Sequence, residues 1–197
     1  LELVGETLRF CLEDLAEIAP EWLRSQVAPE ALRRYGHRIE QARFPEAKAD
    51  QDSLCLTMGK DGYDLLAALY THAKMAELRR YPSVEILRQV WVQQFYLEEG
   101  AVHWRKAGNL PSGALMINSP QDAEARYSEK QGHSWIGYKD HVTETCDAEF
   151  PHLIVNVETT PAPVPDCVMI APIHESLAQK DLLPGEHVVD GGYVDID

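Results

Sequence analysis

The spacing of apolar residues changes along this chain, and that change limits the folds that it can adopt. Over roughly the first hundred residues, apolar side chains recur every three or four positions, which is typical of amphipathic helices. After Gly108, turn-forming residues give way to segments in which apolar and polar residues alternate, as they do in half-buried strands. The sequence therefore predicts an α/β protein, with a helical region over residues 1–108 and a sheet-containing region over residues 109–197.

The helical region divides into several predicted segments. Residues 2–18 place their apolar side chains on one face. Pro20 opens a break before a short helix that starts at Glu21, and Pro29 lies at the N-terminus of another short helix that stops at Gly36. The pair Asp61-Gly62 predicts a turn, followed by a helix over residues 63–76. The clearest helix spans Val84 to Leu97, where one stripe of apolar residues is expected to pack in the core: Val84, Leu87, Val90, Trp91 and Phe95.

Two adjacent strands are predicted in the second region. Residues 134–144 alternate aromatic or β-branched residues with polar ones, and residues 151–159 contain a mostly apolar run. A helix is expected to follow from Asp166, as its N-cap, to Lys180, and then a short buried strand over residues 186–190. Residues 106–133 hold several turn formers and are predicted to be mainly irregular connection.

Acidic residues dominate the charge of the chain. The formal net charge is −14, and residues 132–197 contain twelve acidic residues but only two lysines. Because DNA phosphates are repelled by such a surface, this chain by itself is not expected to be a nucleic-acid-binding module. The four cysteines form no CxxC pair, and neither a signal peptide nor a long apolar run is present. We therefore expect a cytoplasmic protein with reduced cysteines and no membrane segment.

Asp190 is the strongest single candidate for a functional residue. It ends the last predicted strand and precedes Gly191 and Gly192, so that its carboxylate would be held by a regular element with open space beside it. Hard divalent cations such as Mg²⁺ bind carboxylate oxygens in such positions. On these residues alone, the alternative is a carboxylate that caps a turn or a helix.

A series of short motifs along residues 119–197 extends this interpretation. It runs through Asp122-Ala123-Glu124-Ala125-Arg126-Tyr127-Ser128, Trp135-Ile136-Gly137-Tyr138-Lys139-Asp140-His141, Thr143-Glu144-Thr145-Cys146-Asp147, Pro151-His152-Leu153-Ile154, Glu158-Thr159-Thr160-Pro161-Ala162, Asp181-Leu182-Leu183-Pro184-Gly185-Glu186-His187 and Val189-Asp190-Gly191-Gly192-Tyr193-Val194-Asp195. This ordered series resembles the Asp-Asp-Glu transposases of bacterial insertion sequences. Residues 1–8, 22–24 and 84–96 are similar to the region ahead of that signature.

The resemblance implies a ribonuclease-H-like sheet that carries three acids and two metal ions, Mg²⁺ or Mn²⁺. By motif position Asp190 is the second acid, both a catalytic residue and a metal ligand, whereas the first Asp and the Glu are expected upstream of Leu1 and downstream of Asp197. Residues 109–197 would then form a partial ribonuclease-H-like core that lacks its first strand, preceded by a mainly helical insertion over residues 1–108. On this mapping residues 187–190 are strand four, and that strand lacks its usual neighbour.

The implied activity is metal-dependent DNA strand cleavage and transfer at transposon ends. It belongs to the complete enzyme, for which a homo-oligomer is an open option, and this chain is expected to be an internal fragment that is inactive alone. Transposon-end DNA is the implied partner of the complete protein, whereas the acidic fragment is expected to bind DNA weakly or not at all. The alternative is a non-catalytic remnant, or a helical interaction module, with no activity of its own.

Three further residues have two interpretations each. His141 lies either beside the site or in a half-buried structural position, and Lys139 and Arg126 either contact phosphates or belong to the solvated surface. Other chemistries lack their motifs, because the sequence contains no HExxH, GxGxxG, GxxxxGK[ST] or GxSxG pattern. An unrelated hydrolase is therefore the weakest of the interpretations.

Overall fold

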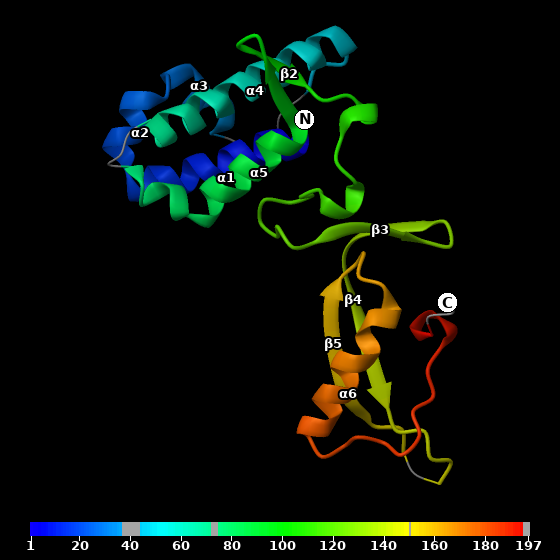
Figure 1. Ribbon diagram of the computed structural model, residues 1–197. Helices are drawn as coiled ribbons and strands as arrows, with labels where there is room; N and C mark the ends of the chain where they lie inside the picture. The colour runs from blue at the N-terminus through cyan, green and yellow to red at the C-terminus, as the bar shows by residue number, and fades with distance from the viewer. Residues whose placement is uncertain (37–43, 72–74, 150, 195–197) are drawn as a thin grey trace. The chain divides into compact units, whose positions relative to one another are not determined.

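The computed structural model of the chain describes residues 1–36, 44–71, 75–149 and 151–194. It confirms the predicted α/β class, with helices and small antiparallel sheets among the described residues. The chain divides into two compact units, Leu1–Ala123 and Glu124–Asp197, which are coloured blue to green and green to red in Figure 1. The helical region predicted for residues 1–108 makes up most of the first unit.

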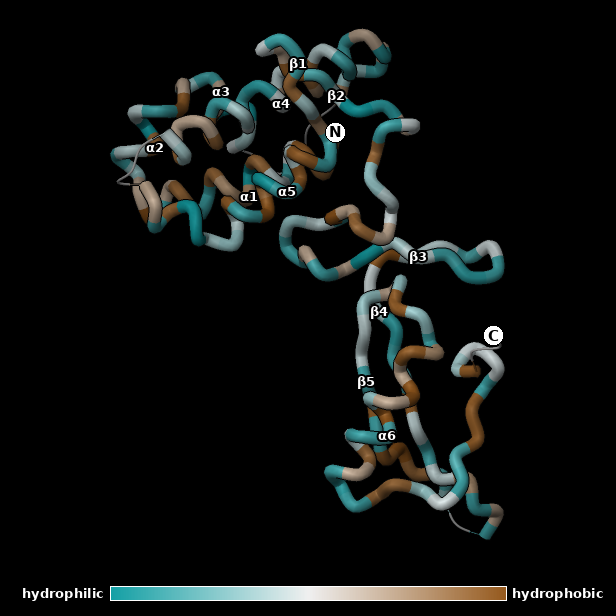
Figure 2. Tube along the Cα trace, viewed as in Figure 1, coloured by the Kyte–Doolittle hydropathy of each residue, from teal (hydrophilic) through white to brown (hydrophobic). Residues whose placement is uncertain are grey.

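Helices build the first unit: α1 (Glu2–Ile18), α2 (Pro20–Gln26), α3 (Pro29–Tyr35), α4 (Lys48–Thr71), the 3-10 turn η3 (Leu78–Arg80) and α5 (Pro82–Gln94). Helices α2, α3 and α5 each begin with proline, whose fixed φ suits the first helical turn. Along α1 and α5, apolar residues recur among polar ones at helical spacing (Figure 2). Their apolar faces share one core, in which the predicted stripe of α5 is fully buried.

Helix α4 runs unbroken through Asp61 and Gly62, so the turn predicted there is wrong. The glycine instead leaves room for the large aromatic residues of α5. A Cβ atom at Gly62 would lie 2.1 Å from atoms of the Trp91 ring, and one at Gly59 would lie 2.6 Å from the Phe95 ring. Helix α4 is described as far as Thr71, whereas the helix was predicted to end at residue 76. Residues 72–74, between these two positions, lie outside the described residues.

Helix α5 ends at Gln94, three residues before the predicted end, and the chain enters a hairpin. Strand β1 (Phe95–Glu98) pairs antiparallel with β2 (Ala101–Trp104). Glu99 and Gly100 between them have φ values of 50° and 79°, as a tight two-residue hairpin turn requires. Phe95 is fully buried four residues after Trp91, so it continues the apolar stripe, and periodicity alone does not reveal the change of structure. The 3-10 turns η4 (Ala107–Asn109) and η5 (Gly113–Leu115) follow.

The second unit contains a three-stranded antiparallel sheet of β3 (Arg126–Lys130), β4 (His133–Glu144) and β5 (Ile154–Pro161). Strands β4 and β5 were predicted, whereas β3 lies in the segment predicted to be irregular. A tight turn at Gln131-Gly132, with φ values of 54° and 80°, closes the β3–β4 hairpin. The long strand β4 changes partner at Gly137: residues 133–137 pair with β3, and residues 138–144 pair with β5.

The β4–β5 ladder has a polar covered face and an apolar open face. The covered face carries Lys139, His141, Thr143, Asn156, Glu158 and Thr160, which are buried or half-buried. The 3-10 turn η6 (Asp166–Met169) and helix α6 (Ile170–Gln179) follow, and α6 packs against β5 (Figure 1). The open face carries exposed apolar side chains: Tyr138, Val142, Ile154 and Val157.

The prediction of a short buried strand over residues 186–190 is wrong. Residues 187–190 have no regular structure, and Val188 is 74% exposed. A strand needs a neighbour to satisfy its backbone N–H and C=O groups, and none of the described strands pairs with this segment. The chain instead reaches a 3-10 turn, η7 (Gly191–Tyr193).

Candidate functional site around Asp190

Asp190 lies at the start of the turn η7, as its N-cap. Its Oδ1 accepts a hydrogen bond of 2.7 Å from the backbone N–H of Gly192, and its backbone carbonyl accepts one of 3.1 Å from the N–H of Tyr193. The residue is exposed, so one carboxylate oxygen is held by the turn while the group remains open to solvent. The capping role that was the alternative for Asp190 is therefore present, and it orients the carboxylate.

A second carboxylate, that of Asp166, lies close to the same turn. A Cβ atom at Gly192 would be 3.0 Å from Oδ1 of Asp190 and 3.1 Å from Oδ2 of Asp166. Asp166 does not cap its helix as predicted; it accepts hydrogen bonds from Lys139 Nζ at 2.5 Å and from Lys130 Nζ at 3.4 Å. Sequence reasoning missed this group of charges because its members are 27 and 36 residues apart and share no motif.

The two lysines control the charge of Asp166. Burial raises the pKa of its carboxyl, whose side chain is only 15% exposed. The hydrogen bonds and charges of Lys139 and Lys130 outweigh burial and hold that pKa below its usual value of 3.8. The carboxylate next to Asp190 is thus negative at neutral pH, but it is neutralised from within the chain.

Asp166→Asn is expected to lower the free energy of unfolding of the second unit by about 1 kcal/mol at pH 7. A carboxyl whose pKa is depressed by folding stabilises the fold above its unfolded pKa, and that contribution is lost as the pH falls through the folded pKa. The stability of the variant should therefore fall less than that of the unsubstituted protein as the pH drops below 3.8. Urea unfolding followed by NMR signals of the second unit measures both effects.

Asp147→Asn is the matched control, because it makes the same change of charge at an exposed position. It should change the free energy of unfolding by less than about 0.5 kcal/mol. Equal stability of Asp166→Asn and the unsubstituted protein at pH 7 would contradict a stabilising ion pair at Asp166.

His141 is buried on the covered face of β4, with 2% of its surface exposed. Its Nδ1 lies 2.7 Å from the hydroxyl of Tyr193, and its Nε2 lies 3.1 Å from the hydroxyl of Thr160. The histidine is therefore structural and buried, and it also contacts the turn that carries Asp190. We call Asp166, Asp190, Lys139, His141 and Tyr193 the Asp190 cluster.

The predicted phosphate contacts have other partners in this structure. Lys139 is engaged with Asp166, and Arg126 Nη1 donates to the carbonyl of Ala125 at 3.3 Å. In the described part of the chain, no group of three or more His, Cys, Asp or Glu side chains is placed to hold a metal ion. Asp190 can supply one carboxylate ligand, but the described residues do not fit a complete Mg²⁺ or Mn²⁺ site.

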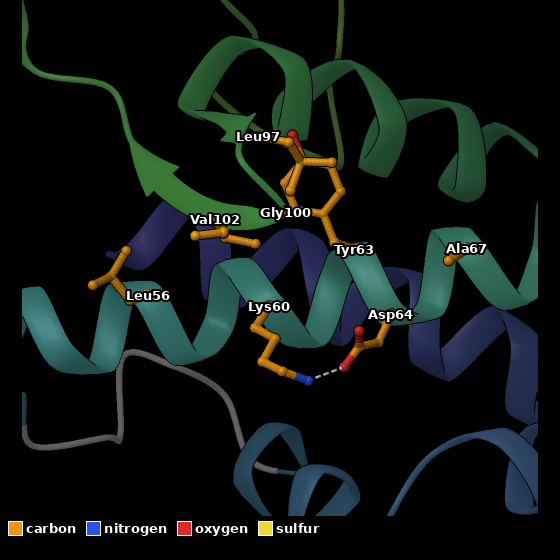
Figure 3. A pocket seen from close by; sticks show the side chains of 9 residues that line it. Leu56, Lys60, Tyr63, Asp64, Ala67, Leu97, Gly100 and Val102 are labelled. Carbon is orange, nitrogen blue, oxygen red and sulfur yellow. Dashed lines mark hydrogen bonds and ion pairs between the residues drawn. The ribbon is translucent and has the colours of Figure 1, made fainter.

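An open groove of about 480 Å³ lies in the first unit, between α4 and the β1–β2 hairpin (Figure 3). Leu56, Leu97 and Val102 contribute apolar side chains, and Tyr63 reaches from α4 toward the hairpin. Its charged residues, Lys60 and Asp64, pair with each other at 2.6 Å. The groove therefore offers apolar contact without converging polar groups, and the Asp190 cluster is the better candidate for chemistry.

Comparison of the chain with protein-family models, with curated proteins and with solved structures finds no match. Among the described residues, no helix combines the length and the apolar character that crossing a bilayer requires.

Proposed function

We propose that this chain is part of an Asp-Asp-Glu transposase, in which Asp190 is one of the acids of the strand-transfer site. The observation that carries the proposal is the position of Asp190 at the end of an ordered series of transposase-like motifs, with its carboxylate exposed and oriented by the Gly192 N–H. A carboxylate that is fixed yet open to solvent is suited to binding a divalent cation.

The order of elements in the second unit is compatible with this proposal. Two antiparallel strands followed by a helix, here β4, β5 and α6, are the order expected for strands two and three and the first helix of a ribonuclease-H-like core that lacks its first strand, whereas the hairpin strand β3 is additional to that order. In the proposed complete protein, a neighbouring strand would give residues 187–190 the pairing that they lack here. The ribonuclease-H-like fold is therefore part of the proposal, beyond the α/β class itself.

The remaining parts of the site belong to the complete protein. We propose that Asp190 would supply one carboxylate ligand to Mg²⁺ or Mn²⁺ in the complete protein, together with further acidic residues that the described residues do not provide. Transposon-end DNA is the proposed substrate, bound mainly by other parts of a cytoplasmic enzyme. The excess of acidic residues in residues 132–197 supports weak or no DNA binding by this chain alone.

Asp190→Asn in the complete transposase is expected to reduce strand cleavage at least about a hundredfold, because an amide is a much weaker ligand for a hard cation than a carboxylate. The measurement is cleavage of a labelled duplex that carries the transposon end, with Mg²⁺ or Mn²⁺. Asp181→Asn makes the same change of charge at an exposed position where φ is 58°, which asparagine tolerates, and it should remain within about twofold.

The two alternatives give different results in this assay. Full activity of Asp190→Asn would show that Asp190 is not part of the site. Absence of cleavage by the unsubstituted complete protein with either cation would favour a non-catalytic remnant.

A further inference from the structure

The turn that carries Asp190 is held mainly by bonds within itself. The Asp190–Gly192 hydrogen bond, the Tyr193 N–H to the Asp190 carbonyl and the Val194 N–H to the Gly191 carbonyl all span two or three residues. Such bonds shape the turn but do not fix its place against the sheet. Tyr193 contributes to that connection, through its ring against Met169, Ile173 and Leu177 and its hydroxyl against His141, while His187, three residues before Asp190, lies 2.8 Å from His174 of α6.

His141 is built to hold this hydroxyl in one place. Its ring lies in the middle of β4, opposite Glu158 of β5, and is almost fully buried. The Thr160 hydroxyl, 3.1 Å from Nε2, fixes the second nitrogen, so the ring cannot turn without losing a hydrogen bond. The rings of His141 and Tyr193 also meet edge to face, with centroids 5.7 Å apart.

We infer that His141 is a positioning residue for Asp190, acting through the hydrogen bond between its Nδ1 and the hydroxyl of Tyr193. Tyr193 follows Asp190 by three residues in a single turn, so anchoring its ring and hydroxyl also places the Asp190 carboxylate. The significance of this positioning role for catalysis rests on the proposed function of Asp190.

Tyr193→Phe tests the connection in the chain as it is, because it removes only the hydroxyl. We expect the order parameter of the Gly192 amide, measured by ¹⁵N relaxation, to fall from about 0.85 to below about 0.6, the range of flexible backbone. Tyr127→Phe is the matched control: it removes a tyrosine hydroxyl that donates to Glu129 at 3.2 Å and not to His141, so the Gly192 amide should stay ordered. An unchanged order parameter in Tyr193→Phe would overturn the inference.

Two replacements of His141 distinguish the roles of its two ring nitrogens. Asparagine places a polar atom near the position of Nδ1 and glutamine one near Nε2, so His141→Asn should keep Gly192 ordered while His141→Gln should not. Equal loss of order in both variants, with unfolding of the second unit, would show only a packing role and would overturn the specific part played by Nδ1.

The complete transposase supplies the functional readout. Tyr193→Phe should lower kcat for strand cleavage by about 10- to 100-fold and leave the KM for DNA unchanged, as expected for a group that orients a ligand. A mobile Gly192 with unchanged kcat, in an enzyme that requires Asp190, would overturn the positioning role. If Asp190→Asn cleaves normally, the proposed function fails, while the order parameters still decide whether His141 holds the turn.

Discussion

Replacing Gly62 with alanine is expected to destabilise the helical unit by about 3 kcal/mol or more. The new methyl group would lie 2.1 Å from two atoms of the Trp91 ring, well inside van der Waals contact. The ring cannot move aside easily, because its Nε1 donates a 2.8 Å hydrogen bond to the Gly59 carbonyl and its other face meets the buried core. Either α5 shifts away from α4 or the indole leaves its site, and both expose core surface.

Urea unfolding followed by tryptophan fluorescence measures this loss, with Gly108→Ala as the control in the same unit. No heavy atom lies within 4 Å of a Cβ at Gly108, so that variant should stay within about 0.5 kcal/mol of the unsubstituted protein. If the clash is the cause, the double variant Gly62→Ala and Trp91→Leu should lose less free energy of unfolding than the two single variants lose together. Wild-type stability of Gly62→Ala would disprove the close approach of α4 and α5.

The second large effect is expected at Gly137, where Gly137→Ala should destabilise the sheet unit by about 2–3 kcal/mol. Gly137 has a φ of 148°, which side chains of L-residues rarely adopt, at the point where β4 changes partner. Its carbonyl also accepts a 3.0 Å hydrogen bond from the Ala162 N–H. No heavy atom lies within 4 Å of a Cβ at this position, so the cost comes from the backbone and not from a clash.

Thermal unfolding monitored by NMR signals of β4 and β5 gives this loss. Gly132→Asn serves as the comparison, since asparagine accepts the left-handed conformation of that tight turn far better than alanine accepts the backbone of Gly137. Loss of β3–β4 pairing in Gly137→Ala with retention of β4–β5 pairing would locate the strain on one side of the residue. Equal stability of Gly137→Ala and the unsubstituted sheet would show that β4 does not need glycine there.

Periodicity and the positions of proline were sufficient to predict α1, α2, α3, α5 and α6, the second half of α4 and two of the three strands in the second unit, because burial of one face imposes a repeat on the sequence, whereas residues 48–60 of α4 were not predicted as helix. It failed where one residue satisfies two patterns. Phe95 continues the stripe of α5 and also begins β1, and Gly62 looks like a turn signal although it sits inside α4. The spacing of glycines opposite bulky aromatic residues depends on tertiary packing, which a local pattern does not record.

The candidate site was predictable only in part. Asp190 was identified from its motif and its following glycines, but the strand expected to carry it is not formed, since strand pairing depends on a neighbour elsewhere in the chain. The ion pairs of Asp166 with Lys139 and Lys130 join segments that are distant in sequence. The contact of His141 with Tyr193 spans 52 residues, and no local pattern points to it.

The reversed polarity of the β4–β5 ladder sets how the second unit responds to temperature. Unfolding raises the heat capacity in proportion to newly exposed apolar surface, and newly exposed polar surface lowers it. In this unit, side chains such as His141 and Asn156 become hydrated on unfolding, whereas Ile154 and Val157 are already in contact with water. We therefore expect the β4–β5 ladder to add little to the heat capacity change of unfolding, most of which would come from the buried apolar residues Met169, Ile173 and Leu177 of the same unit.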